Sequence, residues 1–355
     1  MKNIIILLGL ASFERKNADQ FKLMNKKGWR YAVFTADTRS DSLSLYVKYA
    51  LDKDNKLFFL NSKTNGLLML IKFFIKNKRS IHHIEAISTG GHSNIIATLM
   101  NKIFNVPVLL VERGAVRNFN SSNLLTKLRY IISYKFATLV WYKEPYMLEI
   151  ISKYSSKYIF LPNACFVPIS ILSYDKRRID FLWANRVIPE RDTILYVKAL
   201  KDQVFCNTKN VLLGFQDQKI IDQEMYNLQK DITEICPSNI TILPYINPFP
   251  YMEKAKFFVL LAKQVFGNNA LFEAMARGVV PIVSRSNGIE LLIKNGFNGF
   301  IVENPKKELN QVMEKMLNLD IDEWERLSFN TRKTVLNHYN IDNWAEVLDE
   351  IYKKL

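Results

Sequence analysis

The stretch FFVLLAKQVFGNNALFEAMARGVVPIVS, residues 257–284, contains a complete strand–helix–strand unit. Its two apolar runs, Phe257–Leu261 and Val280–Ser284, predict buried strands. Between them a polar Gly-Asn-Asn turn opens a helical pattern that Gly278 closes. Two apolar strands joined by one helix are typical of a parallel sheet whose faces are both covered.

The same alternation extends over the whole chain, which predicts an α/β protein with doubly wound parallel sheets. A Pro-containing break near residues 162–173 separates two such series. We therefore expect two Rossmann-like domains, 1–168 and 169–339, facing a central cleft, with a C-terminal helix 340–355 that packs back on the first domain. The predicted strands are 4–8, 31–35, 56–60, 83–88, 106–111, 139–142 and 158–161, then 179–184, 210–214, 240–243, 257–261, 280–284 and 299–302.

The composition excludes several classes of protein. Of the 355 residues, 48% are apolar and 23% are charged, so the chain is neither disordered nor fibrous. Three Cys without a Cys-x-x-Cys pair, and four His without ligand spacing, argue against a disulfide scaffold and a metal site. The apolar start Ile4–Leu10 predicts a first strand rather than a signal peptide, and no run of eighteen apolar residues occurs. We expect a cytoplasmic protein without its own membrane anchor.

The positive charge is concentrated in the first half of the chain. Residues 1–170 hold 25 Lys and Arg against 10 Asp and Glu, whereas residues 171–355 hold 24 of each kind. This asymmetry indicates an anionic partner for the first half, which could be a membrane surface, a nucleic acid or an acidic substrate. The alternative is a solvated basic face that only aids solubility. Segments 66–79 and 124–136 combine an apolar face with a basic edge, the pattern of a helix in a lipid interface or of a core helix with a basic outer edge. A nucleic-acid partner is not expected, because no RNA-binding motif occurs.

Common phosphate-binding and metal-binding motifs are missing from the sequence. There is no Gly-x-Gly-x-x-Gly and no Walker loop, which argues against a nicotinamide dehydrogenase and a P-loop ATPase. Asp52-Lys53-Asp54 lies among Lys and Asn residues and predicts a solvated turn. Asp320 with Glu323 predicts the start of a helix.

Two segments of the second half have the residues to bind a diphosphate. Arg186 and Arg191 follow the strand 179–184, where both guanidinium groups can reach one diphosphate. In the second segment, Asn268, Asn269 and Ala270 open a helix whose N–H groups and dipole favour the same anion. Glu273, one turn into that helix, can accept hydrogen bonds from a ribose. The alternative is that these are surface arginines and an ordinary capped helix.

Together these residues resemble the GT-B glycosyltransferases of family 4. Asn185-Arg186 through Arg191 is similar to the family's Gly-Arg…Lys-Gly, in which the basic pair holds the diphosphate. Further similar segments are Glu14-Arg15, Glu112-Arg113-Gly114, Leu161-Pro162-Asn163-Ala164, Ala270–Ala276 with Gly278 and Pro281, Asn287-Gly288-Ile289-Glu290 and Asn298-Gly299-Phe300.

The resemblance implies a GT-B fold and a metal-independent glycosyltransferase. The donor would be a nucleotide-diphosphate sugar, a UDP- or GDP-sugar, and no cofactor would be tightly bound. The acceptor would be a glycan or lipid-linked intermediate of bacterial surface polysaccharide, lipopolysaccharide or capsule, at the inner face of the cytoplasmic membrane. Arg186 and Arg191 would stabilise the leaving diphosphate in a retaining reaction, and Asn268, Asn269, Ala270 and Glu273 would bind the nucleotide.

Two departures from the family's pattern leave alternatives open. Val265 stands where the family has a Glu, and Arg113 stands where it has a His before Gly. An inverting transferase would need a general base on the first domain, and Glu14 is the first candidate, before Glu112 and His92. A nucleotide- or glycan-binding pseudo-enzyme and a nucleotide-sugar epimerase are further alternatives.

Overall fold

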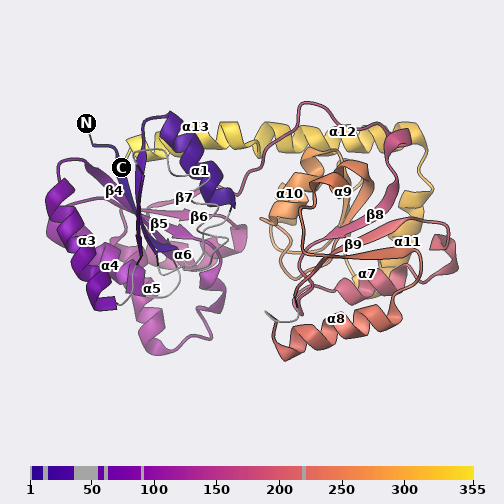
Figure 1. The fold of residues 1–355 in the computed structure, drawn as a ribbon, viewed down its shortest axis with the longest axis horizontal. Helices are drawn as coiled ribbons and strands as arrows, with labels where there is room; N and C mark the ends of the chain where they lie inside the picture. The colour runs from indigo at the N-terminus through magenta and orange to yellow at the C-terminus, as the bar shows by residue number, and fades with distance from the viewer. Residues whose placement is uncertain (1, 11–14, 36–54, 60–62, 89–91, 218–220) are drawn as a thin grey trace. The chain divides into compact units, whose positions relative to one another are not determined.

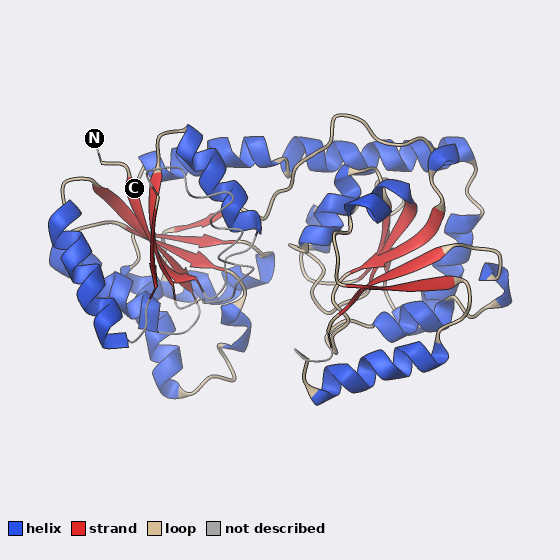
Figure 2. Cartoon of the chain, viewed as in Figure 1, coloured by secondary structure: helices blue, strands red, loops and turns tan. Residues whose placement is uncertain are grey.

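A computed structural model describes residues 2–10, 15–35, 55–59, 63–88, 92–217 and 221–355. The chain forms two compact units: unit 1 comprises residues 1–162 and 342–355, and unit 2 comprises residues 163–341. In each unit helices cover both faces of one sheet (Figure 2). The chain passes from unit 1 to unit 2 after residue 162, before the predicted boundary at residue 168. Residues 163–168 belong to unit 2 because Asn163 Nδ2 donates to Gly267 O at 3.0 Å and the main chain of Cys165 pairs with that of Asn340.

The sheet of unit 1 has seven strands in the order β3-β2-β1-β4-β5-β6-β7, and every neighbouring pair is parallel (Figure 1). Its strands are β1 (Ile4–Leu10), β2 (Arg30–Thr35), β3 (Lys56–Phe59), β4 (Ile81–Ser88), β5 (Val108–Glu112), β6 (Leu139–Tyr142) and β7 (Tyr158–Phe160). Its helices are α1 (Arg15–Lys26), α3 (Lys63–Asn77), α4 (His92–Phe104), α5 (Leu124–Phe136), α6 (Leu148–Tyr154) and α13 (Ile341–Lys353).

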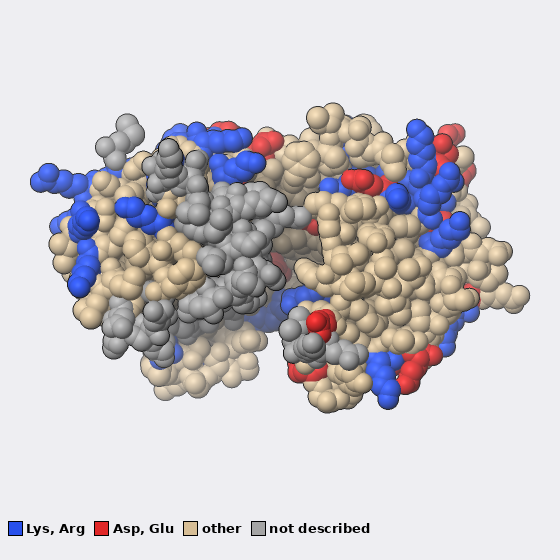
Figure 3. Space-filling view, in the orientation of Figure 1, with Lys and Arg blue, Asp and Glu red and all other residues tan. Residues whose placement is uncertain are grey.

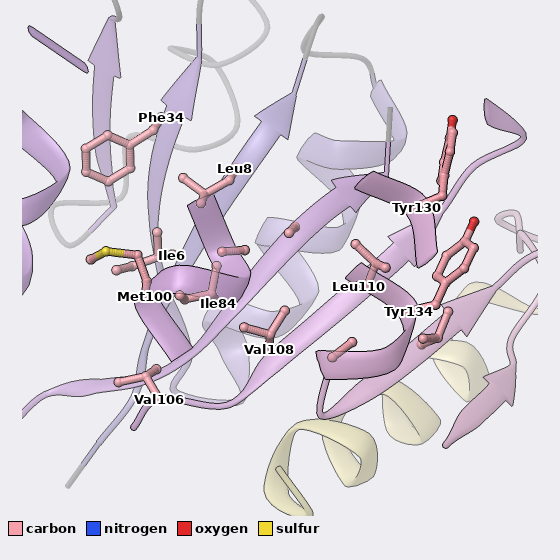
Figure 4. Packing of buried hydrophobic residues seen from close by; sticks show 14 of the residues in the cluster. Ile6, Leu8, Phe34, Ile84, Met100, Val106, Val108, Leu110, Tyr130 and Tyr134 are labelled. Carbon is pink, nitrogen blue, oxygen red and sulfur yellow. The ribbon is translucent and has the colours of Figure 1, made fainter. Parts of the chain in front are cut away.

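Alternating residues of the strands build two cores, one on each face of this sheet. On one face Ile6 pairs with Ile84 and Ile84 with Val108, which gives a row of buried branched side chains across β1, β4 and β5. Figure 4 shows this row beside Met100 of α4. On the other face Ile5 packs with α1 and α13. Because both faces are buried, the strands are almost continuously apolar, as the sequence predicted.

The C-terminal helix α13 contacts the rest of unit 1 through polar as well as apolar side chains. Trp29 Nε1 donates to Asp349 Oδ1 at 2.7 Å, and the Tyr352 hydroxyl donates to Glu85 Oε2 at 2.6 Å. Burial raises the pKa of Glu85, while its hydrogen bonds from Tyr352 and Gln20 oppose that shift. These bonds fix the position of α13 along the sheet.

The sheet of unit 2 has six parallel strands in the order β10-β9-β8-β11-β12-β13. Its strands are β8 (Ile179–Ala184), β9 (Asn210–Phe215), β10 (Ile240–Pro244), β11 (Ala255–Leu260), β12 (Val280–Ser284) and β13 (Phe300–Val302). Its helices are α7 (Thr193–Ala199), α8 (Gln223–Ile235), α9 (Phe249–Lys254), α10 (Asn269–Ala276), α11 (Pro305–Leu317) and α12 (Ile321–His338).

The predicted α/β class with two doubly wound parallel sheets is confirmed. Each predicted strand corresponds to an observed strand, and the ends differ by a few residues at most. Helix α12 begins after Asp320, whose side chain accepts from Glu323 N at 2.7 Å, as predicted for this helix start. In the part of the chain that the structure describes, no helix has both the length and the apolar character needed to cross a bilayer.

Candidate active site

The strand order of unit 2 creates a switch point between β8 and β11. From β8 the chain passes to β9 on one side, whereas β11 is followed by β12 on the other side. The loops that leave the carboxyl ends of β8 and β11 therefore diverge, and a crevice between such loops is where ligands bind in open α/β sheets. Asn185 and Arg186 follow β8, and the segment 261–268 connects β11 to α10.

The two loops at this edge are tied together by main-chain bonds. Arg191 pairs with Ala262 in an antiparallel bridge, and Asp192 N donates to Leu261 O at 3.0 Å. In addition, Arg191 Nη1 donates to Arg186 O at 3.2 Å. These contacts hold both arginines at the carboxyl edge, next to the loop that leads to α10.

A close backbone approach supports the loop after β8. Gly214, at the end of β9, has a φ of +140°, and a Cβ there would lie 1.9 Å from Asn185 O. Glycine is therefore required at this position, since any side chain would displace the loop that holds Arg186. The Val187 N–H also donates to Gly214 O at 3.2 Å.

The two arginines form a local concentration of positive charge. Arg186 is exposed and Arg191 is half-buried. Burial, and then the neighbouring charge of Arg186, lower the pKa of Arg191 to about 10, against a weaker opposing effect of Tyr245 and Glu190. No carboxylate of the described residues forms an ion pair with either guanidinium. A pair of adjacent cations without an acidic partner is suited to an anion of more than one charge.

Helix α10 begins at the same edge. Asn268 is its N-cap, because its Oδ1 accepts from Leu271 N at 3.0 Å. Its other amide atom, Nδ2, donates to Asn185 Oδ1 at 2.8 Å. One side chain therefore caps α10 and also connects it to the end of β8. The first N–H groups of a helix have no hydrogen-bond partner within the helix. In α10 these are the N–H groups of Asn269 and Ala270.

Glu273 lies one turn into α10 with 9% of its surface exposed. Its main-chain oxygen accepts from Arg277 Nη1 at 3.0 Å, which stabilises the end of the same short helix. The structure thus brings Arg186, Arg191, Asn268 and the start of α10 to one edge, with Glu273 on the helix that begins there.

The turn before α10 has no carboxylate. Val265 is fully buried, and its N–H donates to Ser286 Oγ at 3.2 Å. The neighbouring Gln264 has a buried Oε1 that finds no hydrogen-bond partner among the described residues. The polar side chains at and next to the family's Glu position are therefore an uncharged hydroxyl and an uncharged amide.

The structure describes only one of the three candidate bases of unit 1 in full. Glu14 lies outside the described residues, and His92 opens α4 with a side chain that is not described. Glu112 is fully buried at the end of β5, where its carboxylate accepts from Gly114 N, Val116 N and the Tyr134 hydroxyl at 3.0, 3.2 and 2.8 Å. Burial raises its pKa. A carboxylate enclosed in this way has no access to a substrate, so the suggestion of Glu112 as a base is wrong.

Glu144 is a residue that the sequence analysis missed. It follows β6, and burial raises its pKa to about 7 against the opposing charge of Arg117. One of its carboxylate oxygens is buried and has no hydrogen-bond partner in the described part of the chain. The sequence signal that could have pointed to Glu144 is its position as a polar residue after a predicted strand.

In the described part of the chain, no group of three His, Cys, Asp or Glu side chains is arranged to hold a metal ion.

Comparison with known proteins agrees with this geometry. Residues 171–334, nearly all of unit 2, match the family model of glycosyl transferases group 1. Residues 171–334 form a group 1 glycosyltransferase domain. The predictions of a glycosyltransferase and of a GT-B fold are confirmed.

Relatives and solved structures resemble the chain over most of its length. A UDP-Gal:alpha-D-GlcNAc-diphosphoundecaprenol alpha-1,3-galactosyltransferase of Escherichia coli is 23% identical over an alignment of 313 residues, and the match covers 81% of this chain and 78% of that protein. HepE of Anabaena, solved with UDP and glucose, is 13% identical with a TM-score of 0.79 over 100% of both chains. The lipopolysaccharide outer core galactosyltransferase WaaB, in its apo form, is 14% identical with a TM-score of 0.67 over 100% of both chains.

Proposed function

We propose that this glycosyltransferase transfers a sugar from a UDP-sugar to a lipid-linked glycan acceptor in the synthesis of a bacterial surface polysaccharide. The observation that carries the proposal is the pair Arg186 and Arg191, held beside the start of α10 without an acidic partner in the described residues. Two relatives support the choice of substrates. The Escherichia coli galactosyltransferase is named for UDP-Gal and a diphosphoundecaprenol acceptor, and HepE was solved with UDP and glucose.

In the proposed reaction the protein stabilises the departing diphosphate. Negative charge grows on the diphosphate as the sugar–oxygen bond breaks, and Arg186 and Arg191 neutralise it together with the N–H groups at Asn269 and Ala270. Because two guanidinium groups supply the positive charge, the reaction needs no divalent ion. Glu273 accepts hydrogen bonds from the ribose hydroxyls and so fixes the nucleotide in the crevice.

We further propose that the anomeric configuration is retained. The acceptor hydroxyl attacks the face that the diphosphate leaves, and a phosphate oxygen takes its proton, so no protein base is required. An inverting reaction would instead need a carboxylate such as Glu14 on unit 1. The anomeric configuration of the product, measured by NMR, distinguishes the two mechanisms.

A thermal-shift panel with UDP, GDP, ADP, dTDP and CMP tests the donor class. Ligand at a hundred times its dissociation constant adds about 2.7 kcal/mol of stability, which corresponds to a shift of several degrees in unit 2. We expect a selective response to UDP that is lost in Arg191→Ala. Equal responses to all five nucleotides, or none to any, would contradict the proposed donor. A UDP-sugar epimer or its product found without an acceptor would instead identify an epimerase.

We propose that unit 1 docks on anionic lipid through an apolar stripe on α5. Leu124, Leu128, Ile132 and Phe136 follow one another at four-residue spacing and are 74%, 43%, 40% and 39% exposed. Helical residues four apart lie on one face, so these four side chains form a continuous exposed row. We define the α5 stripe as these four residues.

Basic residues surround the α5 stripe. Lys127, Arg129 and Lys135 lie on the same helix, and Lys102 of α4 stands 4.6 Å from the centre of the Phe136 ring. Unit 1 as a whole carries 27 Lys and Arg against 14 Asp and Glu, whereas unit 2 carries 22 against 20. Figure 3 shows Lys and Arg side chains also along the outer edge at α3. Apolar insertion with basic flanks is the chemistry of an anionic lipid surface.

Co-sedimentation with phosphatidylglycerol-containing vesicles tests the lipid proposal. We expect binding that falls with added salt and that drops at least tenfold when Leu124, Leu128 and Ile132 are all replaced by Ser. The matched control replaces Leu291 and Phe329, two exposed apolar residues of unit 2, by Ser. Equal binding of both variants, or binding to neutral vesicles alone, would exclude the α5 stripe as the lipid surface.

A further inference from the structure

Asn185 has a buried hydrogen-bond donor for which the described residues supply no partner. The residue follows β8 directly and is 6% exposed. Its main-chain groups are used, since its N–H donates to Leu213 O at 3.1 Å and its carbonyl accepts from Trp183 Nε1 at 3.2 Å. Its side-chain Nδ2 is buried and finds no hydrogen-bond partner in the part of the chain that the structure describes. Native proteins rarely leave such a group unpaired, so a partner is expected when the protein functions.

The orientation of the Asn185 side chain follows from the cap of α10. The Leu271 N–H can only donate, so the atom of Asn268 that faces it is the oxygen. The remaining atom of Asn268 is therefore the NH₂ group, which requires an acceptor, and Asn185 presents Oδ1 to it at 2.8 Å. The NH₂ group of Asn185 is consequently the end that is left without a partner. The N-cap thus fixes which end of a neighbouring amide is available.

The surroundings of Asn185 point to an anion as the partner. Arg186 is the next residue along the chain, and Arg191 donates to the carbonyl of Arg186. The bond to Asn268 joins Asn185 to the start of α10, where N–H groups and the helix dipole favour negative charge. The Asn185 NH₂ group adds one more N–H donor to the guanidinium groups and the helix N–H groups, and all of these favour an anion.

We propose that Asn185 Nδ2 donates a hydrogen bond to the diphosphate of the nucleotide-sugar donor and thereby positions it between the two arginines. This inference rests on the proposed function. The family pattern has Gly at this position, so the contact distinguishes this chain from that pattern. A purely structural role needs only the acceptor Oδ1, which Asp would supply equally well. The two roles therefore differ in what they predict for Asn185→Asp.

Calorimetric titration of the full-length protein with UDP, UMP and uridine tests the proposal. Asn185→Asp keeps the acceptor for Asn268 but turns an oxygen toward the diphosphate, so UDP affinity should fall at least 30-fold and uridine affinity less than threefold. Asn185→Ala removes the donor without adding charge and should weaken UDP three- to tenfold. The control Asn207→Asp adds the same charge to an exposed loop before the amino end of β9 and should leave UDP affinity unchanged.

The outcomes separate this inference from the proposed function. If UDP binds the wild-type protein, weakens in Arg191→Ala and binds Asn185→Asp as well as the wild type, the Asn185 contact is wrong and the donor site stands. If UDP and uridine weaken equally in both Asn185 variants, or if the thermal midpoint without ligand falls in parallel, the role is structural and the inference is overturned. If UDP does not bind the wild-type protein at all, the proposed function itself fails.

Discussion

Two arginines at opposite ends of the same strand pair show how a similar pKa shift can accompany different roles. Arg177 precedes β8, and its guanidinium reaches Ala255 at the start of β11, whereas Arg191 follows β8 and its main chain pairs with Ala262 after β11. Burial lowers the pKa of each to about 10. By pKa alone the two residues are equivalent, although Arg177 is buried and Arg191 is half-buried.

Their hydrogen bonds separate them. The guanidinium of Arg177 donates to Leu172 O, Ala255 O and Arg277 O at 3.2, 2.5 and 2.7 Å and lies 5.0 Å from the Trp324 ring. Among the described residues, Arg191 makes one side-chain bond, to the carbonyl of a residue that is itself a cation. A guanidinium has five N–H donors, so Arg177 is largely satisfied and Arg191 is not. The comparison teaches that unused donors, rather than a shifted pKa, distinguish a binding group from a structural one.

The largest expected effect is on activity. Arg186→Ala and Arg191→Ala should each lower kcat about a few hundredfold, or about 3 kcal/mol of transition-state stabilisation, because each removes a donor to the diphosphate. Thermal midpoints should change little, since Arg186 is exposed and Arg191 donates to a single main-chain oxygen among the described residues. Steady-state kinetics with the purified variants measures this. Turnover near the wild-type value in either variant would contradict the assignment.

Arg177→Met should show the opposite behaviour. It leaves three main-chain oxygens without their donor at the amino edge, so we expect a loss of about 2–3 kcal/mol in the free energy of unfolding of unit 2. UDP affinity below the unfolding transition should stay within about twofold of the wild type. Urea unfolding followed by Trp fluorescence measures the loss. A stable Arg177→Met variant with weak UDP binding would break the distinction between the two arginines.

Asn268 combines both roles, so two substitutions can separate them. Asn268→Ala removes the N-cap of α10 and should cost about 1 kcal/mol of stability. Asn268→Asp retains the cap acceptor but loses the donor to Asn185 Oδ1, so it should be more stable than Asn268→Ala and less stable than the wild type. Its charge repels a diphosphate, so UDP should bind more weakly. Paired unfolding and titration measurements test this. Equal stability of the Ala and Asp variants would show that the cap bond contributes nothing measurable.

The smallest effect extends the comparison to two carboxylates of unit 1. Glu112 accepts hydrogen bonds from Gly114 N, Val116 N and the side chains of Tyr134 and Ser88. Glu144, with a pKa raised to about 7, has a buried oxygen without a partner in the described residues. A raised folded-state pKa means that the stability present below about pH 4.5 is lost as the pH rises toward 7. Glu144→Gln removes this loss and should raise the thermal midpoint by about 2–4 °C at pH 8 and little at pH 4.5.

The exposed Glu149→Gln variant is the control for the pH series. Its carboxylate is 79% exposed on α6, so its replacement should leave the pH profile of the thermal midpoint unchanged. A profile that is the same for wild type and Glu144→Gln would mean that Glu144 is solvated as an ordinary carboxylate.

Much of the fold could be predicted because each strand is a short apolar run between turn residues, and this pattern is local. The site was partly predictable for the same reason: Arg186 and Arg191 follow a predicted strand, and Asn268 precedes a predicted helix. Glu112 was misjudged because its position after a strand says nothing of the hydrogen-bond donors that enclose it. Glu144 was missed because its raised pKa comes from side chains distant in sequence.

The sequence by itself determined the order of strands and helices, the parallel α/β class and the charge difference between the two halves, since these depend on residues close together along the chain. Only the tertiary structure decided which polar groups keep unused hydrogen-bonding capacity. The bond from Asn268 to Asn185 joins the loop after β11 to the loop after β8. Arg177 and Arg191 differ in how many of their N–H donors are used, because the folded backbone brings different carbonyls near each of them. Hydrogen bonds of this kind act over a few ångströms in space, and no local sequence pattern encodes them.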